Sequence, residues 1–249
     1  MKGMIFAAGM GTRLRPLTDD RPKALVEVCG TPMLEHVILR MINAGIEDIV
    51  VNVHHLAPMI KSFLEVNDDF GITIHVSDES DELLDTGGGI LKARKWLDGD
   101  DPFLVHNADI MTDLDLGEMM DEHVRTGADA TLLVAERNTS RYLLFDNNMK
   151  MHGWENRKTG ETIPEVIDVN AFQALAFGGI HVLSPSIFSY LEKWNGDGEI
   201  KKFSITPFYA TSASTIDIRG YNPSSDSYRW LDIGKPETLA QAAAMFGNN

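Results

Sequence analysis

Short apolar runs alternate with helical patterns through the first half of the chain, and this alternation constrains the fold more than any other feature. The segments between the runs repeat apolar residues at intervals of three and four. We predict strands at residues 4–7, 49–53, 72–76, 103–106 and 130–135, and helices near residues 34–42, 89–97 and 118–126. Such a repeat predicts a parallel sheet with helices on both faces. Ligands bind these sheets at the carboxyl ends of the strands.

Beyond residue 137 the pattern loosens. Residues 142–145 and 149–154 suggest a hairpin around Asp146-Asn147-Asn148. Further strands are predicted at residues 172–182, 216–220 and 228–231, and helices at residues 187–193 and 237–246. No linker or internal repeat separates the two halves, so we predict one α/β unit over residues 1–249, with the later part forming a lid or subdomain.

Composition and charge exclude several classes of protein. The single cysteine, Cys29, excludes a disulfide scaffold and a cysteine-rich zinc site. No apolar run reaches the roughly 18 residues of a membrane span, and the N-terminus lacks a secretory signal, so we expect a cytoplasmic chain with no membrane partner. With 22 Lys and Arg against 37 Asp and Glu, the net charge is −15. This charge repels nucleic acid, and a polyanionic ligand would need a local positive pocket.

A glycine-rich, cationic segment follows the first predicted strand. The backbone at Gly9 and Gly11 can turn tightly and approach a ligand, so its N–H groups could surround phosphate oxygens together with Thr12. The Arg13 guanidinium can pair with two oxygens at once, and Lys23 can bring a point charge to the same anion. The segment contains neither Gly-Lys-Ser/Thr nor a third spaced glycine, which excludes a Walker P-loop and a dinucleotide fingerprint.

Two aspartates follow predicted strands far apart in the sequence. Asp109 follows the strand at residues 103–106, and Asp232 follows Trp230-Leu231. Two such carboxylates can share one Mg²⁺ with substrate phosphates, because Mg²⁺ is usually held by one or two carboxylates plus phosphate and water. For either aspartate alone, the alternative is a helix cap or a solvent-facing side chain.

Thr86 and three glycines precede a predicted helix. A helix that opens with Gly87 and Gly88 offers free N–H groups and close approach to a base edge or a ribose. The alternative is a flexible loop that only leads into the helix.

At this point the sequence resembles the sugar-1-phosphate nucleotidyltransferases. A-A-G-M-G-T-R-L-R-P-L-T (7–18) and R-P-K-A-L-V (21–26) look like the signature of that family. The resemblance continues through L-L-D-T-G-G-G-I-L-K-A (83–93), F-L-V-H-N-A-D (103–109), F-G-G-I-H-V-L-S-P (177–185) and W-L-D-I-G (230–234). The subgroup it resembles comprises N-acetylmuramate-1-phosphate uridylyltransferases and mannose-1-phosphate guanylyltransferase-like proteins.

The resemblance implies a three-layer α/β/α, Rossmann-like fold with a mostly parallel, mixed central sheet. Residues 1–136 would be the nucleotide-binding half, and residues 137–249 the sugar-binding half with the second metal ligand. The implied reaction transfers a nucleoside monophosphate from a nucleoside triphosphate to a sugar 1-phosphate and releases pyrophosphate. UTP is the favoured donor, and guanylyl transfer to mannose 1-phosphate or a similar sugar is the alternative.

The resemblance also assigns roles to individual residues. The catalytic residues would be Arg13, Lys23 and Asp109, and Mg²⁺ would be held by Asp109 and Asp232. The nucleotide-binding residues would be Ala8, Gly9, Gly11, Thr12, Arg13, Glu79, Thr86, Gly87 and Gly88, with Glu82 competing for the position of Glu79. The sugar-binding residues would be Asn107, Glu155 and Gly179. The sequence departs from the family at Ala108, where a glycine is usual, and at Asn156, where a lysine usually follows the acid.

Two rival functions predict other features. A glycosyltransferase that uses a nucleotide sugar would also need strand-end aspartates, and Asp113-Leu114-Asp115 offers an Asp-x-Asp pattern. It would not need the glycine-rich loop or Lys23, which suit a triphosphate. A nucleotide sensor without turnover would not need Arg13, Lys23 and both strand-end aspartates together.

Overall fold

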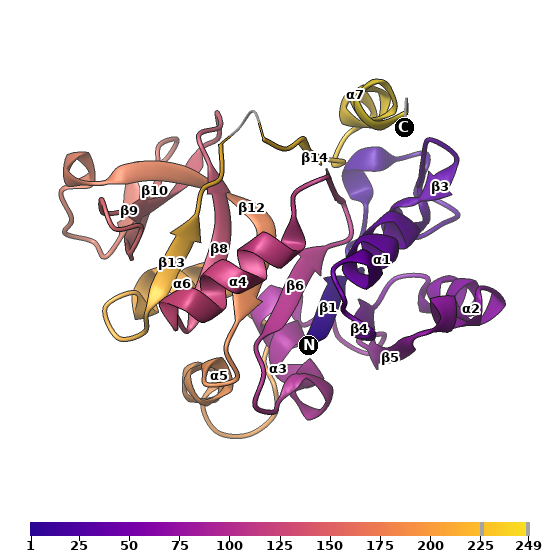
Figure 1. Cartoon of the computed structure of the whole chain (residues 1–249), viewed down its shortest axis with the longest axis horizontal. Helices are drawn as coiled ribbons and strands as arrows, with labels where there is room; N and C mark the ends of the chain where they lie inside the picture. The colour runs from indigo at the N-terminus through magenta and orange to yellow at the C-terminus, as the bar shows by residue number, and fades with distance from the viewer. Residues whose placement is uncertain (225–226, 248–249) are drawn as a thin grey trace.

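The computed structural model describes residues 1–224 and 227–247. A ten-stranded sheet runs through it in the order β11-β10-β9-β12-β6-β1-β4-β5, and β8 pairs with both β12 and β13 (Figure 1). Strands β5, β4, β1 and β6 are parallel, whereas β12 is antiparallel to β6, β8 and β9. The sheet is therefore mixed with mostly parallel strand directions, and the predicted fold class is confirmed.

All five strands predicted in the first half are present. They are β1 (Lys2–Phe6), β4 (Asp48–Val53), β5 (Thr73–Asp78), β6 (Phe103–Asn107) and β8 (Ala130–Ala135). Met4 of β1 lies opposite Val50 and Val105, and these three side chains belong to one hydrophobic cluster. Because successive side chains of a strand point to opposite faces, Ile5 belongs to the cluster on the other face.

The second half extends the same sheet. Its strands are β9 (Arg141–Phe145), β10 (Met151–Asn156), β11 (Glu161–Ile163), β12 (Gln173–Leu183) and β13 (Ile218–Tyr221). The predicted hairpin is formed by β9 and β10, and Asp146 closes it by accepting the N–H groups of Asn148 and Lys150 at 2.8 and 3.0 Å. The long strand β12 joins the two halves because it pairs with strands of both.

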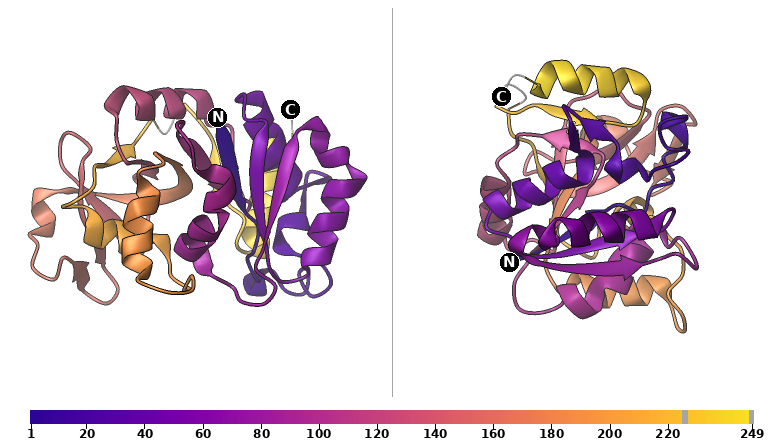
Figure 2. Two further views of the ribbon diagram at one scale, coloured as in Figure 1. Left: turned by 90° about the horizontal axis from the view of Figure 1, so that it is seen from below. Right: turned by 90° about the vertical axis from the view of Figure 1, so that its right-hand side faces the viewer.

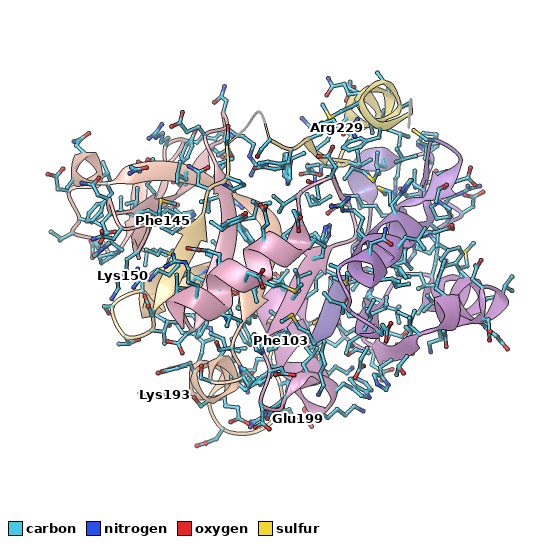
Figure 3. The ribbon with its side chains drawn as sticks, in the orientation of Figure 1. Phe103, Phe145, Lys150, Lys193, Glu199 and Arg229 are labelled. Atoms are coloured by element: carbon cyan, nitrogen blue, oxygen red, sulfur yellow. The ribbon has the colours of Figure 1, made fainter. Side chains whose placement is uncertain are left out.

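Six helices cover the two faces of the sheet (Figure 2). One face packs against α3 (Asp85–Leu97), α5 (Ile187–Asn195) and α6 (Ile205–Ser212). The other packs against α1 (Met33–Asn43), α2 (Ala57–Val66) and α4 (Leu116–Thr126). Phe103 and Phe145, labelled in Figure 3, are fully buried in the cluster on the first face. Burying such a side chain contributes about 1.5–3 kcal/mol relative to exposure.

The sequence patterns did not reveal α2 and α6. Helix α2 begins after Leu56, whose backbone is left-handed (φ 55°) and offers no capping side chain. Helix α6 buries Ile205, Phe208 and Tyr209 and lacks a regular polar face. The usual N-cap residue is missing from α2, and the usual amphipathic pattern is missing from α6. No helix of the described residues is long and apolar enough to cross a membrane.

Two small sheets and the last helix lie toward the carboxyl ends of β1 and β6, away from the N-terminus (Figure 1). The small sheets are β2 (Glu27–Val28) with β3 (Thr31–Pro32), and β7 (Ile110–Thr112) with β14 (Trp230–Asp232). Helix α7 (Pro236–Phe246) packs on both through a third cluster, which includes Val28, Met111 and Ala242. Arg229, labelled in Figure 3, donates to Asp113 and to the Met245 carbonyl, and so joins β14 to the end of α7.

Candidate active site

The glycine-rich loop connects β1 to a short 3₁₀ helix, Thr12–Leu14. Gly11 has φ +65°, and a Cβ there would lie 2.9 Å from Thr18 Cγ2 and 3.0 Å from Lys23 Cβ. The Thr18 hydroxyl donates to the Gly11 carbonyl at 2.8 Å. Only glycine therefore allows this loop to pack so closely against the segment that carries Lys23.

Lys23 and Asp109 form an ion pair at the carboxyl end of the parallel strands. Lys23 begins a 3₁₀ helix after Pro22, and Asp109 follows β6 by two residues. Their side chains are 11% and 26% exposed, so the pair is largely buried but still accessible to a ligand. A ligand that enters there meets a cation and an anion together.

Asp232 lies directly beside Asp109. Strand β14 pairs with β7 so that Asp232 is opposite Ile110, and the Ile233 N–H donates to the Asp109 carbonyl at 2.8 Å. Burial raises the pKa of Asp232, and the negative charge of Asp109 raises it further. Asp232 Oδ1 is buried and has no hydrogen-bond partner in the described part of the chain.

This pair of carboxylates fits a divalent cation. An unpartnered buried carboxylate oxygen next to a second carboxylate is an arrangement that a bound cation would relieve. Among residues 1–224 and 227–247 no three His, Cys, Asp or Glu side chains cluster as a metal site. The remaining ligands of such an ion would have to come from substrate and water, as Mg²⁺ permits.

Arg13 lies on the other side of Asp232. A Cβ added to Gly234 would be 2.8 Å from Arg13 Nη2 and 3.0 Å from Asp232 Oδ1, so both groups border the same glycine. The Arg13 side chain is exposed. The structure thus brings Arg13, Lys23, Asp109 and Asp232 into one constellation from four separate segments.

A cavity of about 320 Å³, called here the first cavity, opens beside this constellation. Predicted site residues that line it are Ala8, Gly9, Lys23, Thr86, Asn107 and Asp109. Residues that line it without having been predicted are Phe6, Ala7, Ala24, Asn52, Leu83, Asp85, Ala108 and Lys202.

Gly87 and Gly88 differ from the expectation that their N–H groups are free. Both donate to the Phe203 carbonyl, at 2.9 and 3.3 Å, and both residues are buried inside the first turn of α3. A Cβ on Gly87 would lie 2.2 Å from the Phe203 ring. The glycines therefore let the segment around Phe203 approach the helix, and Thr86 alone of the three reaches the first cavity.

Glu79 lies behind the first cavity rather than in its wall. It is fully buried, it accepts from Asn52 Nδ2 at 2.8 Å and from the Leu84 N–H at 2.9 Å, and burial raises its pKa. Asn52 lines the cavity and also accepts the Ala7 N–H at 2.8 Å. Glu79 thus orients Asn52, which is not among the predicted site residues. The only sign of its role in the sequence is its position as a polar residue inside an apolar strand. Glu82 is exposed.

The three predicted sugar residues separate into two groups. Asn107 and Gly179 are in contact, since a Cβ on Gly179 (φ +74°) would lie 2.9 Å from Asn107 Nδ2. Glu155 is elsewhere, on β10, where it accepts from Arg157 Nε at 2.8 Å. Its neighbours Trp154 and Asn156 line a separate cavity of about 470 Å³, called here the second cavity.

The Asp-x-Asp pattern has structural partners. Asp113 accepts from the backbone and the side chain of Arg229. Asp115 caps α4 by accepting the Glu118 N–H at 3.1 Å. Neither carboxylate lines the first or the second cavity, which removes the feature that favoured a glycosyltransferase.

Comparison with known proteins identifies the family. The sequence model of the Nucleotidyl transferase family matches residues 2–248. The chain is 31% identical to the N-acetylmuramate alpha-1-phosphate uridylyltransferase of Caulobacter vibrioides, over 97% of this chain and 95% of the relative. It is 30% identical to the mannose-1-phosphate guanyltransferase of Hypocrea jecorina over 99% of this chain, but it spans only 64% of that relative.

A solved structure supports the fold. A protein from Bacillus anthracis, described as a glucose-1-phosphate thymidylyltransferase, superposes with a TM-score of 0.82 over 100% of this chain and 96% of its own, at 21% identity. A likeness at this identity concerns the fold alone. On the match of the family over residues 2–248, the chain belongs to the Nucleotidyl transferase family.

Proposed function

We propose that this protein transfers a nucleoside monophosphate from a nucleoside triphosphate to a sugar 1-phosphate. The observation that carries the proposal is the constellation of Arg13, Lys23, Asp109 and Asp232 beside the first cavity. Relatives that match almost the whole chain have names of this reaction class. We propose further that residues 1–136 bind the nucleotide, that residues 137–249 bind the sugar, and that the protein acts in the cytoplasm.

The chemistry requires charge control rather than proton transfer. An oxygen of the acceptor phosphate, already ionised at neutral pH, attacks the α-phosphorus. A new P–O bond forms, the bond from the α-phosphorus to the oxygen bridging to the β-phosphate breaks, and pyrophosphate leaves with that electron pair. The protein must hold two polyanions in line and offset their repulsion.

The residues of the constellation suit these tasks. Arg13 and the backbone of Gly9–Thr12 would hold the outer phosphates, while Lys23 would reach the α-phosphate once a ligand competes with Asp109 for its ammonium group. When bound to Asp109 and Asp232, a divalent cation, which we propose is Mg²⁺, would offset negative charge on the α-phosphate. Asn107, Gly179 and Glu155 remain the proposed sugar residues.

Arg13 and Lys23 should act at different phosphates. We expect Arg13→Ala to raise mainly the KM for the triphosphate and Lys23→Ala to lower mainly kcat. Each loss should correspond to about 2–4 kcal/mol of transition-state stabilisation, as for one preorganised electrostatic donor. Steady-state kinetics with each substrate varied would measure both effects, with the exposed Arg15→Ala as a matched control. Near-normal kinetics in either variant would remove that residue from the mechanism.

UTP should be the preferred donor. The relative that matches this chain over nearly its own full length is a uridylyltransferase, and uracil is small enough to be read by backbone groups and one side chain. The test is pyrophosphate release from each of the four nucleoside triphosphates, paired with N-acetylmuramate 1-phosphate, mannose 1-phosphate and glucose 1-phosphate. A preference for GTP with mannose 1-phosphate would support the alternative suggested by the Hypocrea jecorina relative. No release from any pair would refute the reaction class.

A further inference from the structure

The first and second cavities lie side by side on the face of the sheet covered by α3 and α6. Phe6 lines the first cavity and Phe177 lines the second, and the rings of both pack against the ring of His181, at centroid distances of 6.5 and 5.5 Å. Along β12, Gly179 follows Phe177 by two residues and contacts Asn107 of the first cavity. A ligand with two parts could therefore occupy both cavities at once.

The segment of residues 202–207 forms a boundary between the two cavities. Lys202 lines the first cavity, whereas Ser204, Thr206 and Pro207 line the second. The segment is held in place by α3 and the residues before it. The Phe203 N–H donates to the Leu84 carbonyl at 3.1 Å.

Three further hydrogen bonds hold the same segment. The Phe203 carbonyl accepts from the first turn of α3, and the Ile205 N–H donates to Thr86 Oγ1 at 2.9 Å. These contacts fix the backbone that follows Lys202, and the Lys201 N–H, which donates to Asn195 Oδ1 at 2.7 Å, fixes the backbone before it. The side chain of Lys202 itself is exposed at the rim of the first cavity.

Neighbouring lysines in this segment have different surroundings. Lys201 Nζ donates to the Asn195 carbonyl at 2.9 Å, and Lys201 lines neither cavity. Lys202 forms no ion pair and no side-chain hydrogen bond within residues 1–224 and 227–247. Lys23, the other lysine of the first cavity, is already paired with Asp109. Lys202 thus brings an uncompensated positive charge to the boundary.

We propose that Lys202 binds the phosphate of the acceptor sugar 1-phosphate and so positions its attacking oxygen. This inference rests on the proposed function. In a nucleotide sugar the diphosphate joins the nucleoside to the sugar, so a nucleoside in the first cavity and a sugar in the second place the acceptor phosphate at their boundary. A lysine there offsets the repulsion between the acceptor phosphate and the triphosphate.

The residues that line the second cavity are consistent with a positive charge that comes to the acceptor phosphate from a residue outside this cavity. Asn156 lines this cavity with a neutral amide. Arg141, the cation that does line it, comes from β9, and no residue of β9 borders the first cavity. Of these two cations, Lys202 is the one that reaches the cavity containing Lys23 and Asp109.

The experiment compares Lys202→Met, Lys202→Arg and the matched control Lys201→Met in steady-state kinetics. The substrates are the triphosphate and the sugar 1-phosphate that the wild-type protein uses fastest among the pairs named above. We expect Lys202→Met to raise the KM for the sugar 1-phosphate about 10- to 100-fold, as for the loss of one charge-assisted hydrogen bond. The KM for the triphosphate should change less than about 3-fold, and Lys202→Arg should restore most of the loss.

The outcomes separate this inference from the proposed function. If the wild-type protein releases pyrophosphate but Lys202→Met has the same KM for the sugar 1-phosphate as Lys201→Met, the role of Lys202 is overturned and the reaction class stands. An increase only in the KM for the triphosphate would also overturn it, because Lys202 would then bind the donor. If the wild-type protein uses none of the pairs, the proposed function fails, and this inference fails with it.

Discussion

Replacing Asp109 or Asp232 with asparagine should lower the rate of nucleotidyl transfer by about 10³-fold, because each variant removes one of two carboxylates proposed to hold the same cation. Asparagine keeps the size and shape of the side chain, so folding should survive. Since both residues serve one ion, the two losses should not add: the double variant should be hardly slower than the slower single variant. A double-mutant cycle on transfer rate across a Mg²⁺ titration measures this.

The Asp232→Asn substitution, which should lower activity, should raise the stability of the metal-free protein. Asp232 has a buried oxygen without a partner and lies beside the negative charge of Asp109, so Asp232→Asn removes an unfavourable charge when no divalent cation is present. We expect the Tm in EDTA to rise by about 2–4 °C, which corresponds to about 1 kcal/mol in a chain of this size.

A matched control distinguishes the carboxylate pair from other aspartates. Asp113→Asn removes an aspartate that is paired with Arg229 instead of lying in the constellation, so it should lose stability and keep most of the activity. Additive losses in the Asp109 and Asp232 double-mutant cycle, or wild-type activity in EDTA, would show that these two aspartates do not form one metal site.

Mild acid should destabilise the fold through three buried histidines. Burial lowers the pKa of His106 and His123 to about 4 and that of His181 to about 3. In the unfolded chain each imidazole titrates near pH ~6.5. Below that pH these imidazoles bind protons in the unfolded chain but stay neutral in the folded protein. Stability is therefore complete above pH ~6.5 and falls as the pH drops toward 4, by up to about 1.4 kcal/mol per pH unit for each imidazole.

His123 offers the sharpest test of this linkage. Its ring nitrogens bond Thr131 Oγ1 at 2.8 Å and Ser184 Oγ at 3.0 Å. His123→Gln should be less stable than wild type at pH 7.5, but its free energy of unfolding should fall less steeply with pH, by about 1 kcal/mol per pH unit. Urea unfolding at pH 7.5, 6.5, 5.5 and 5.0 would measure both slopes.

His55→Gln is the control for the acid experiment, because it removes a half-buried imidazole that has no ion pair or side-chain hydrogen bond among the described residues. It should keep the wild-type slope. A wild-type free energy of unfolding that stays level between pH 6.5 and 5.0, or an unchanged slope in His123→Gln, would contradict the role of the buried histidines.

Local patterns were enough to predict the strands and most of the helices. Strand β8 was predicted with the bounds that it has, and β1, β4 and β6 within two residues, because apolar runs between polar boundaries identify buried strands. Helix α3 begins four residues before its predicted start, since its glycine-rich first turn is stabilised by the contact with Phe203 and not by helix propensity. Helix α6 escaped prediction because it is short and its buried residues Phe208, Tyr209 and Ala210 are consecutive, which leaves no clear amphipathic period.

The sequence by itself determined which chemical groups are available: the glycine-rich loop, Arg13, Lys23 and the two strand-end aspartates are recognisable from residue type and short-range spacing. Only the tertiary structure decided how they combine. The pairing of β14 with β7 brings Asp232 next to Asp109 across 123 residues of sequence. Other contacts between distant segments place Glu79 against Asn52 and occupy the N–H groups of Gly87 and Gly88. Such contacts also bring Lys202 to the boundary of the two cavities. Local spacing cannot reveal such contacts, because burial and charge depend on which distant segments the sheet brings together.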